Sequence, residues 1–452
     1  MTLAPPVLCQ QNLSNPCMEL IELSLSKSYT LKSARSDLGI DSLESKSIKQ
    51  NYIPTLTMNG AYAYGAGKFN VDIPTFDLPI SGISLFDGEA EFDAKGHWFN
   101  TNLTAKALIF SGMQVTYGAK ANNEKIKAKN YLLEGERSTI IKDVIDTFDK
   151  IELVEQSKSV LSESEKRLAK EKLKVKVAIN NGLATPFERE KISAAELHIA
   201  SKKMELEGNL QLLYLKLGML TGMDAGSLED YEFELKPWLL TRQDQTYKDR
   251  PELQALRASI EAYNYKLKMN KNAFLPKVQA FATLAYFSLF DTSINTPYET
   301  PISEQPVNLD LNHFTGFPTY LVGVGFEWEI FNGLKNSNET QKTSIEKSIA
   351  ENNKNDAEEK LQLFEQKVMI ELEIKNQQIL FKEKEKDVAF YALNLAVQSY
   401  QEGLINITER LQAELAYQEA ALSYYKIIAM QRQAALELLS ATGSLTLTNL
   451  NN

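Results

Sequence analysis

The side chains that most often carry catalysis or bind metal ions are scarce in this chain of 452 residues. It contains three histidines (His97, His198 and His313) and two cysteines, Cys9 and Cys17. Neither set has the spacing of a metal site. The sequence also lacks a glycine-rich phosphate loop, a GxSxG motif and an HExxH motif. We therefore predict that the chain is not an enzyme and uses no cofactor or metal, and we expect the histidines to be surface or loop groups.

The two cysteines leave two interpretations open. Cys9 and Cys17 could form a disulfide in an oxidising compartment, or they could be spare thiols. Because their spacing fits no disulfide framework, spare thiols are favoured. The sequence before Cys9 faintly resembles a lipidation site, but Leu8 is too large for the residue preceding a lipidated cysteine, so acylation is not expected. Residues 1–10 have no basic region and too short an apolar run for a signal peptide.

The overall composition is that of a folded, acidic protein. Hydrophobic residues make up 43% and charged residues 24% of the chain, and 49 Lys and Arg against 59 Asp and Glu give a net charge of −10. Nucleic acids bind to clustered positive charge, which is missing here, so we exclude a nucleic-acid partner. No stretch of about 18 apolar residues is present, so no transmembrane helix is predicted.

An internal repeat is the main organising feature of the sequence. Gly182-Leu183 recurs 221 residues later as Gly403-Leu404, and Glu188-Arg189 recurs at the same offset as Glu409-Arg410. Three further pairs follow the same order: Phe110-Ser111-Gly112 with Phe331-Asn332-Gly333, Thr221-Gly222 with Thr442-Gly443, and Tyr52-Ile53-Pro54 with Phe274-Leu275-Pro276. We therefore divide the chain into a flexible segment (1–17), a first repeat (18–222), an insert (223–248), a second repeat (249–443) and a tail (444–452). The insert is expected to pack against the helices and the tail to fray.

Each repeat opens with helical sequence, over 18–50 and about 250–272, and then changes to a period of two. Strands are predicted at about 53–66, 98–110, 276–288 and 319–331, each with one apolar and one polar face. The polar faces carry Thr55, Thr57, Asn59, Asn100, Asn102, Thr104, Lys106, Glu327 and Glu329. At 11 to 13 residues, these strands have the length of a tilted membrane span. The segments 69–96 and 289–318 are rich in Pro, Gly, Asp, Ser and Asn and are predicted to be long surface loops.

A long helical hairpin follows each strand pair. The first is predicted over about 117–220 with its tip at Gly182, and the second over about 338–441 with its tip at Gly403. Their apolar seams include Val144 and Phe148 in the first hairpin and Val368 and Leu372 in the second. Rods of this length need partners along their sides, which favours coiled-coil packing.

Four alternating strands cannot close a barrel alone, and an open sheet edge is not stable in lipid. Several chains must therefore contribute strands to one barrel, with the polar faces towards water. Tyr62, Tyr64, Trp98, Tyr286, Tyr320 and Trp328 are candidates for the aromatic girdles at the lipid boundary. The alternative is a soluble β-domain with one buried face.

The order of strand, loop, strand, long helix, Gly-Leu turn and helix, written twice, resembles the TolC-like outer-membrane efflux proteins over residues 18–443. The resemblance implies an internally duplicated α+β membrane protein with four strands per subunit. It implies a homotrimer with a 12-stranded β-barrel in the cell outer membrane, and a coiled-coil α-helical tunnel through the periplasm. It also implies that the hairpin tips meet a periplasmic adaptor protein, which links the duct to an inner-membrane pump.

The same resemblance assigns functional residues to the tips. The adaptor-binding residues would be Asn181, Gly182, Leu183, Glu402, Gly403 and Leu404, where the family often has Val-Gly-Leu. Glu188 and Glu409 would line the periplasmic entrance. Physically, a glycine allows a partner backbone to approach and an exposed leucine offers an anchor, while a ring of carboxylates attracts cations. Two simpler interpretations remain open: the glycines could only end helices, and the glutamates could only complement helix dipoles.

The leading hypothesis is therefore the outer-membrane channel subunit of a tripartite efflux system. The first alternative keeps this architecture and changes the cargo, as in the duct of a type I protein-secretion system. The alternative from another class is a soluble coiled-coil scaffold protein.

Overall fold

The protein is described by a computed structural model, which covers residues 15–77, 84–229, 235–240, 246–299 and 306–451. The chain divides into two compact units, each built from separate stretches of sequence. The helical unit consists of Met1–Ser42, Asn123–Ala262 and Glu346–Asn452. The sheet unit consists of Leu43–Asn122 and Tyr263–Ile345.

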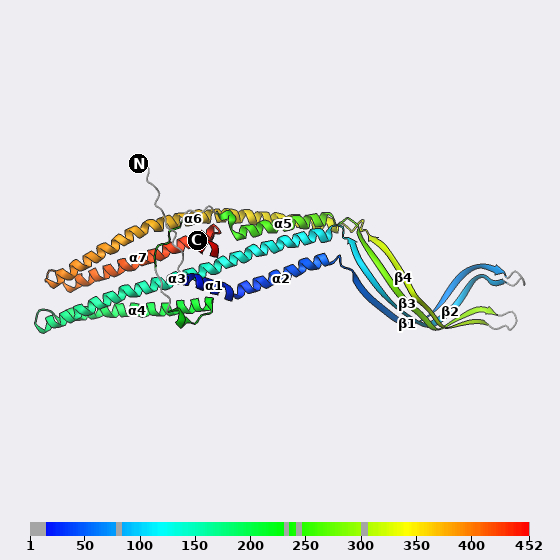
Figure 1. Ribbon diagram of the computed structural model, residues 1–452, viewed down its shortest axis with the longest axis horizontal. Helices are drawn as coiled ribbons and strands as arrows, with labels where there is room; N and C mark the ends of the chain where they lie inside the picture. Colours follow the sequence, from blue (N-terminus) through cyan, green and yellow to red (C-terminus); the bar gives the residue numbers. More distant parts are fainter. Residues whose placement is uncertain (1–14, 78–83, 230–234, 241–245, 300–305, 452) are drawn as a thin grey trace, which may run out of the picture. The chain divides into compact units, whose positions relative to one another are not determined.

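Two helical hairpins dominate the helical unit (Figure 1). The first pairs α3 (Gln114–Asn180) with α4 (Pro186–Thr221), and the second pairs α6 (Lys335–Gln401) with α7 (Ile407–Ala441). The shorter helices are α1 (Asn15–Lys27), α2 (Tyr29–Gln50), α5 (Pro251–Lys271) and α8 (Leu447–Asn451), with the 3₁₀ turns η1 (Ala225–Leu228) and η2 (Tyr247–Asp249). Gly182 lies in the turn between α3 and α4, and Gly403 lies in the turn between α6 and α7. Among the described residues, no helix is both long and apolar enough to cross a membrane.

The core of the helical unit is made by the predicted seams. Val144 and Ile145 of α3 are completely buried and pack in one cluster with Leu20 of α1 and Leu217 of α4. On α6, Val368 is also completely buried. Burial of one apolar stripe stabilises each long helix, because its intrinsic helical propensity alone would not.

The insert packs on the helices, as predicted. Trp238 is buried, and its backbone is held by Gln431 of α7. The side-chain oxygen of Gln431 accepts from the Trp238 N–H at 2.8 Å, and its amide nitrogen donates to the Trp238 carbonyl at 2.8 Å. Gln431 therefore substitutes for the strand or helix partner that this irregular segment lacks.

The two ends of the chain differ from the prediction. The tail forms α8, with Leu445 and Leu450 buried, because these two apolar side chains dock on the helical core. The flexible segment predicted at 1–17 gives way to helix at Asn15. Cys17 is a buried free thiol, while Cys9 lies outside the described residues.

The sheet unit contains one antiparallel sheet in the order β1-β2-β3-β4. Its strands are β1 (Thr55–Asp77), β2 (Ser84–Phe110), β3 (Lys277–Glu299) and β4 (Pro306–Glu327). The register places Met58 opposite Leu103, Leu103 opposite Leu284, and Leu284 opposite Tyr320. Opposed residues share a face, so the predicted apolar positions do lie on one face of the sheet. We call this face A, and the face of Thr57 and Thr104 face B.

The expectations about the two loop segments, Trp98 and Glu329 were wrong. The segments 69–96 and 289–318 are largely strand, so β1 to β4 have 23, 27, 23 and 22 residues. Pairing within a hairpin satisfies the backbone hydrogen bonds whatever the side chains are. The strands therefore continue through segments of polar composition. Trp98 lies opposite Ala63, on face B and not with Tyr62. Since β4 ends at Glu327, Glu329 is outside the sheet, and the Trp328 indole N–H donates to the Phe274 carbonyl at 2.9 Å.

Candidate functional site

The first hairpin tip closes through two backbone hydrogen bonds. The Gly182 N–H donates to the Ile179 carbonyl at 3.0 Å, and the Leu183 N–H donates to the Ala178 carbonyl at 2.8 Å. Gly182 has φ 74°, in the left-handed region. These features define a Schellman motif, in which glycine avoids the strain that a side chain would suffer.

The second tip repeats this geometry. The Gly403 N–H donates to the Tyr400 carbonyl at 3.1 Å, the Leu404 N–H donates to the Ser399 carbonyl at 2.8 Å, and Gly403 has φ 75°. The glycines therefore do end helices, as the simpler interpretation held. A methyl group added to Gly182 or Gly403 would meet no atom within 4 Å, so both glycines also face open space.

Each tip presents an apolar side chain to its surroundings. Leu183 is 82% exposed and Leu404 is 71% exposed, and the adjoining Asn181 and Glu402 are exposed as well. Burying a leucine gives about 1.5–3 kcal/mol. The tips thus combine an accessible backbone with an anchor that the isolated chain leaves in solvent.

The two tips differ at the start of the following helix. The N-cap of α4, Thr185, makes no side-chain cap bond, and Pro186 follows it. The N-cap of α7, Asn406, accepts from the backbone N–H groups of Thr408 and Glu409 at 2.9 and 3.1 Å. The Glu409 carboxylate in turn accepts from the Asn406 N–H at 2.9 Å, which completes a capping box.

The two carboxylates predicted for the entrance therefore have different local partners. Glu409 caps its own helix, whereas Glu188 accepts a 2.9 Å hydrogen bond from the hydroxyl of Tyr400 on the second hairpin. Burial and then this bond to a carboxylate raise the pKa of Tyr400 above its ordinary value of 10.0. The hydroxyl thus stays protonated and able to donate. A shared role for Glu188 and Glu409 at an entrance remains a prediction.

Further contacts join the two hairpins behind the tips. The Lys191 ammonium donates to the hydroxyl of Thr408. Ile407, the first residue of α7, is 4% exposed and packs in one cluster with Ile192 and Ile199 of α4 and Leu168 of α3. Pro186, at the matching position of the first tip, is exposed. The first residue of the following helix is therefore buried at the second tip and exposed at the first, although contacts behind the tips join the two hairpins.

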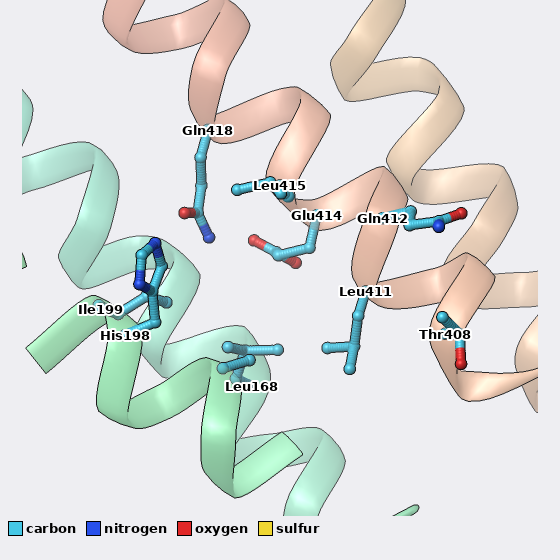
Figure 2. A pocket seen from close by; sticks show the side chains of 10 residues that line it. Leu168, His198, Ile199, Thr408, Leu411, Gln412, Glu414, Leu415 and Gln418 are labelled. Atoms are coloured by element: carbon cyan, nitrogen blue, oxygen red, sulfur yellow. The ribbon is translucent and has the colours of Figure 1, made fainter. Parts of the chain in front are cut away.

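A cleft of about 290 Å³ lies between the hairpins near this cluster (Figure 2). Figure 2 shows His198 and Ile199 on α4 across from Leu411, Glu414 and Gln418 on α7. The complete lining is Leu168, Ala195, His198, Ile199, Thr408, Leu411, Gln412, Glu414, Leu415 and Gln418.

The Glu414 carboxylate in this cleft is already engaged. Arg167 of α3 donates to it at 2.8 Å and Arg410 approaches it at 3.3 Å, while Glu414 and Arg410 are 2% and 1% exposed. Glu414 is therefore not a free base, and the part of the chain that the structure describes holds no group of metal-binding side chains.

Sequence reasoning gave no role to Tyr400, Arg167, Arg410 or Glu414. The repeat held a partial indication, because Arg410 corresponds to Arg189. However, Arg189 is half exposed and pairs with its neighbour Glu190, and only the structure shows that Arg410 is buried.

Comparison with known proteins agrees with this architecture. Residues 244–444 match the family model of the outer membrane efflux protein. No curated protein sequence gives a significant match. Among solved structures, the Campylobacter jejuni CmeC outer membrane channel is similar at 14% identity and a TM-score of 0.70, over 98% of this chain and 90% of that chain. The open state of the Neisseria gonorrhoeae MtrE outer membrane channel is similar at 14% identity and a TM-score of 0.72, over 95% and 89%.

The outer membrane protein VceC of Vibrio cholerae is similar at 15% identity and a TM-score of 0.69, over 95% and 96% of the two chains. The resemblance predicted from the repeat is thereby confirmed: the second repeat matches the outer membrane efflux protein family, and the whole chain has the fold of these channels. The matched CmeC and MtrE structures are described as outer membrane channels.

Proposed function

We propose that this chain is one subunit of a homotrimeric outer-membrane efflux duct. The observation that carries the proposal is a row of apolar residues left exposed on α6. Ile374, Phe381, Val388 and Leu395 recur every seven residues and are 46%, 71%, 68% and 46% exposed. A heptad row is the packing surface of a coiled coil, so it requires another helix.

The sheet supplies an independent argument for several copies. β1 and β4 are the edge strands of a four-stranded sheet, and each is paired on one side only. Face A carries exposed apolar residues such as Met58, Tyr62 and Val322, at 73%, 61% and 73%. Lipid can cover this face only if the edges are paired, and strands from further copies would pair them.

The trimer is tested by placing a charge in the apolar heptad row of α6. Phe381→Glu should abolish the trimer seen in the outer-membrane fraction by unheated electrophoresis. Lys382→Glu, at the neighbouring and partly exposed position, should leave the trimer intact. A wild-type chain that fractionates as a soluble monomer would instead favour the scaffold alternative and overturn the proposal.

We further propose that the tips bind a periplasmic adaptor, which connects the duct to an inner-membrane pump. The exposed Leu183 and Leu404 support this assignment. Leu183→Ser with Leu404→Ser should abolish export and adaptor cross-linking while trimers still form. The matched variant, Leu183→Met with Leu404→Met, keeps the apolar anchor and should retain both. Loss in both variants, or in neither, would contradict the assignment.

The name of the matched family favours efflux over type I protein secretion as the role of the duct. Glu188 and Glu409 are proposed to give its entrance a preference for cations. Glu188→Gln with Glu409→Gln should lower the cation selectivity of the purified trimer in a planar bilayer, whereas an unchanged reversal potential would contradict this role.

A further inference from the structure

The β1–β2 hairpin keeps one uninterrupted register far beyond the length of a membrane span. Thr55 lies opposite Lys106 and Ile73 lies opposite Gly88, with no shift in between. Because the register is constant, each residue of this stretch can be assigned to face A or face B. We call residues 55–64 with 97–106 the proximal segment, and residues 65–73 with 88–96 the distal segment.

The proximal segment has an apolar face A and a polar face B. Face A carries Leu56, Met58, Tyr62, Leu103 and Phe99, and face B carries Thr57, Asn59, Asn102 and Thr104. Its ten residues per strand match the 9–11 residues of a tilted transmembrane strand. Tyr64 and His97 form its last pair on face A, and His97 Nδ1 also makes a 2.7 Å hydrogen bond with the Tyr62 hydroxyl.

In the distal segment the polarity of the two faces is reversed: face A is polar and face B is apolar. Face A now carries Lys68, Asn70, Glu91, Asp93 and Lys95. The Lys68 ammonium pairs with Glu91 at 2.7 Å and approaches Asp93 at 3.8 Å. Such a charged, exposed face is compatible with water and not with the lipid interior.

Face B of the distal segment has become apolar. Phe69 lies opposite Phe92, and both share this face with Val71 and Ala94. Phe69 is 57% exposed and Val71 is 39% exposed. The exchange occurs without a register slip, so it is a property of the sequence and not of a bulge.

The distal segment also separates from its neighbour in the sheet. Pairing of β2 with β3 ends at Asp93 and Asn295, while β1 and β2 stay paired to Asp77 and Ser84 (Figure 1). Beyond Asp93 the hairpin is therefore a two-stranded ribbon with an uncovered apolar face. An isolated ribbon of this kind is marginally stable in water, so its apolar face needs a cover.

We infer that the apolar face B of the distal segment packs against the same segment of the other copies. The three distal segments would then meet across the outer exit of the duct. The inference rests on the proposed trimer. Face B is continuous with the polar face proposed to line the lumen, so in a closed barrel it points towards the other copies and away from lipid. Thirteen residues of β1 beyond Tyr64, at about 3.3 Å each, give the hairpin a reach of roughly 40 Å. The exit would thus be closed by an apolar contact that cargo must displace.

Disulfide trapping tests the contact. In a Cys9→Ser background, which leaves only the buried Cys17, Phe92→Cys should give cross-linked dimers when the trimer is oxidised and then denatured. Asp93→Cys, one residue away on face A, should remain monomeric. Phe69→Cys with Lys68→Cys as its control provides a second pair in case Phe92→Cys does not assemble.

The outcomes separate this inference from the proposed function. Trimers in all variants with cross-links confined to the face B cysteines would support the contact. Trimers without cross-links, or with equal cross-linking from both faces, would overturn the inference but would not contradict the proposed duct. Absence of the trimer in the wild-type chain would overturn the duct itself, and with it the inference.

Discussion

The hydroxyl of Tyr400 donates a 2.9 Å hydrogen bond to the carboxylate of Glu188, and this bond joins the end of α6 to the first turn of α4. The two residues are 212 positions apart in the sequence. The bond therefore ties the second hairpin to the first hairpin just behind their tips.

Removing this hydroxyl should loosen the tips locally without unfolding the protein. Tyr400→Phe keeps the ring in its partly buried position and deletes only the bond, which costs about 1 kcal/mol. Amide hydrogen exchange in residues 181–190 should become about fivefold faster. Tyr391→Phe, on the same helix at a position that is 66% exposed, should leave the exchange rates unchanged. Equal rates in Tyr400→Phe and the wild type would show that the bond does not restrain the tip.

The two helix starts give a second, internally matched prediction. Asn406→Ala removes the capping box of α7 and should cost about 1 kcal/mol, whereas Thr185→Ala removes no cap bond from α4 and should cost much less. Amide exchange in the first turns, 407–410 and 186–189, measures both effects. A similar acceleration at both tips would contradict the inequivalence that the structure shows.

The tips could be predicted from the sequence because their geometry is local. A left-handed turn between two helices requires glycine, and Gly182 and Gly403 identify it without any tertiary information. The same holds for the strand faces near Met58 and Leu103, where the alternation is clean. Strand length was not predictable in this way, because the polarity exchange near Tyr64 breaks the expected pattern while the backbone pairing continues.

The contacts between the hairpins were not predictable for a different reason. Arg410 and Glu414 read as ordinary charged helix residues, and their spacing of four suggests a solvent-exposed pair. Their burial to 1% and 2% depends on Arg167, which is 247 residues from Glu414. Only the packing of one hairpin on the other brings these charges together.

Cys17 is expected to be chemically inert in the folded protein. Burial raises the pKa of its thiol to about 12. At pH 8 the reactive thiolate fraction would then be on the order of 1,000-fold lower than for a free cysteine with a pKa of about 8.5. Alkylation followed by mass spectrometry should modify Cys17 only after denaturation. Rapid alkylation of Cys17 in the native protein would contradict its buried position, and a Cys9–Cys17 disulfide in the same spectra would exclude the spare-thiol interpretation.

Asp41 of α2 should make stability depend on pH. Burial pushes the pKa of its carboxyl up, but hydrogen bonds from Lys129 and Lys125 of α3 outweigh burial and hold the pKa below the ordinary value of 3.8. A carboxyl whose pKa is lowered by folding stabilises the folded state above its ordinary pKa, and this contribution is lost as the pH falls through the lowered value. Asp41→Asn should therefore lower the melting temperature at pH 7 by a few degrees, and the difference from the wild type should shrink below about pH 4. Asp37→Asn, at an exposed position on the same helix, should show no such pH-dependent difference. A deficit in Asp41→Asn that stays constant down to pH 3 would mean that the lost interaction is not the ion pair with Lys125 and Lys129.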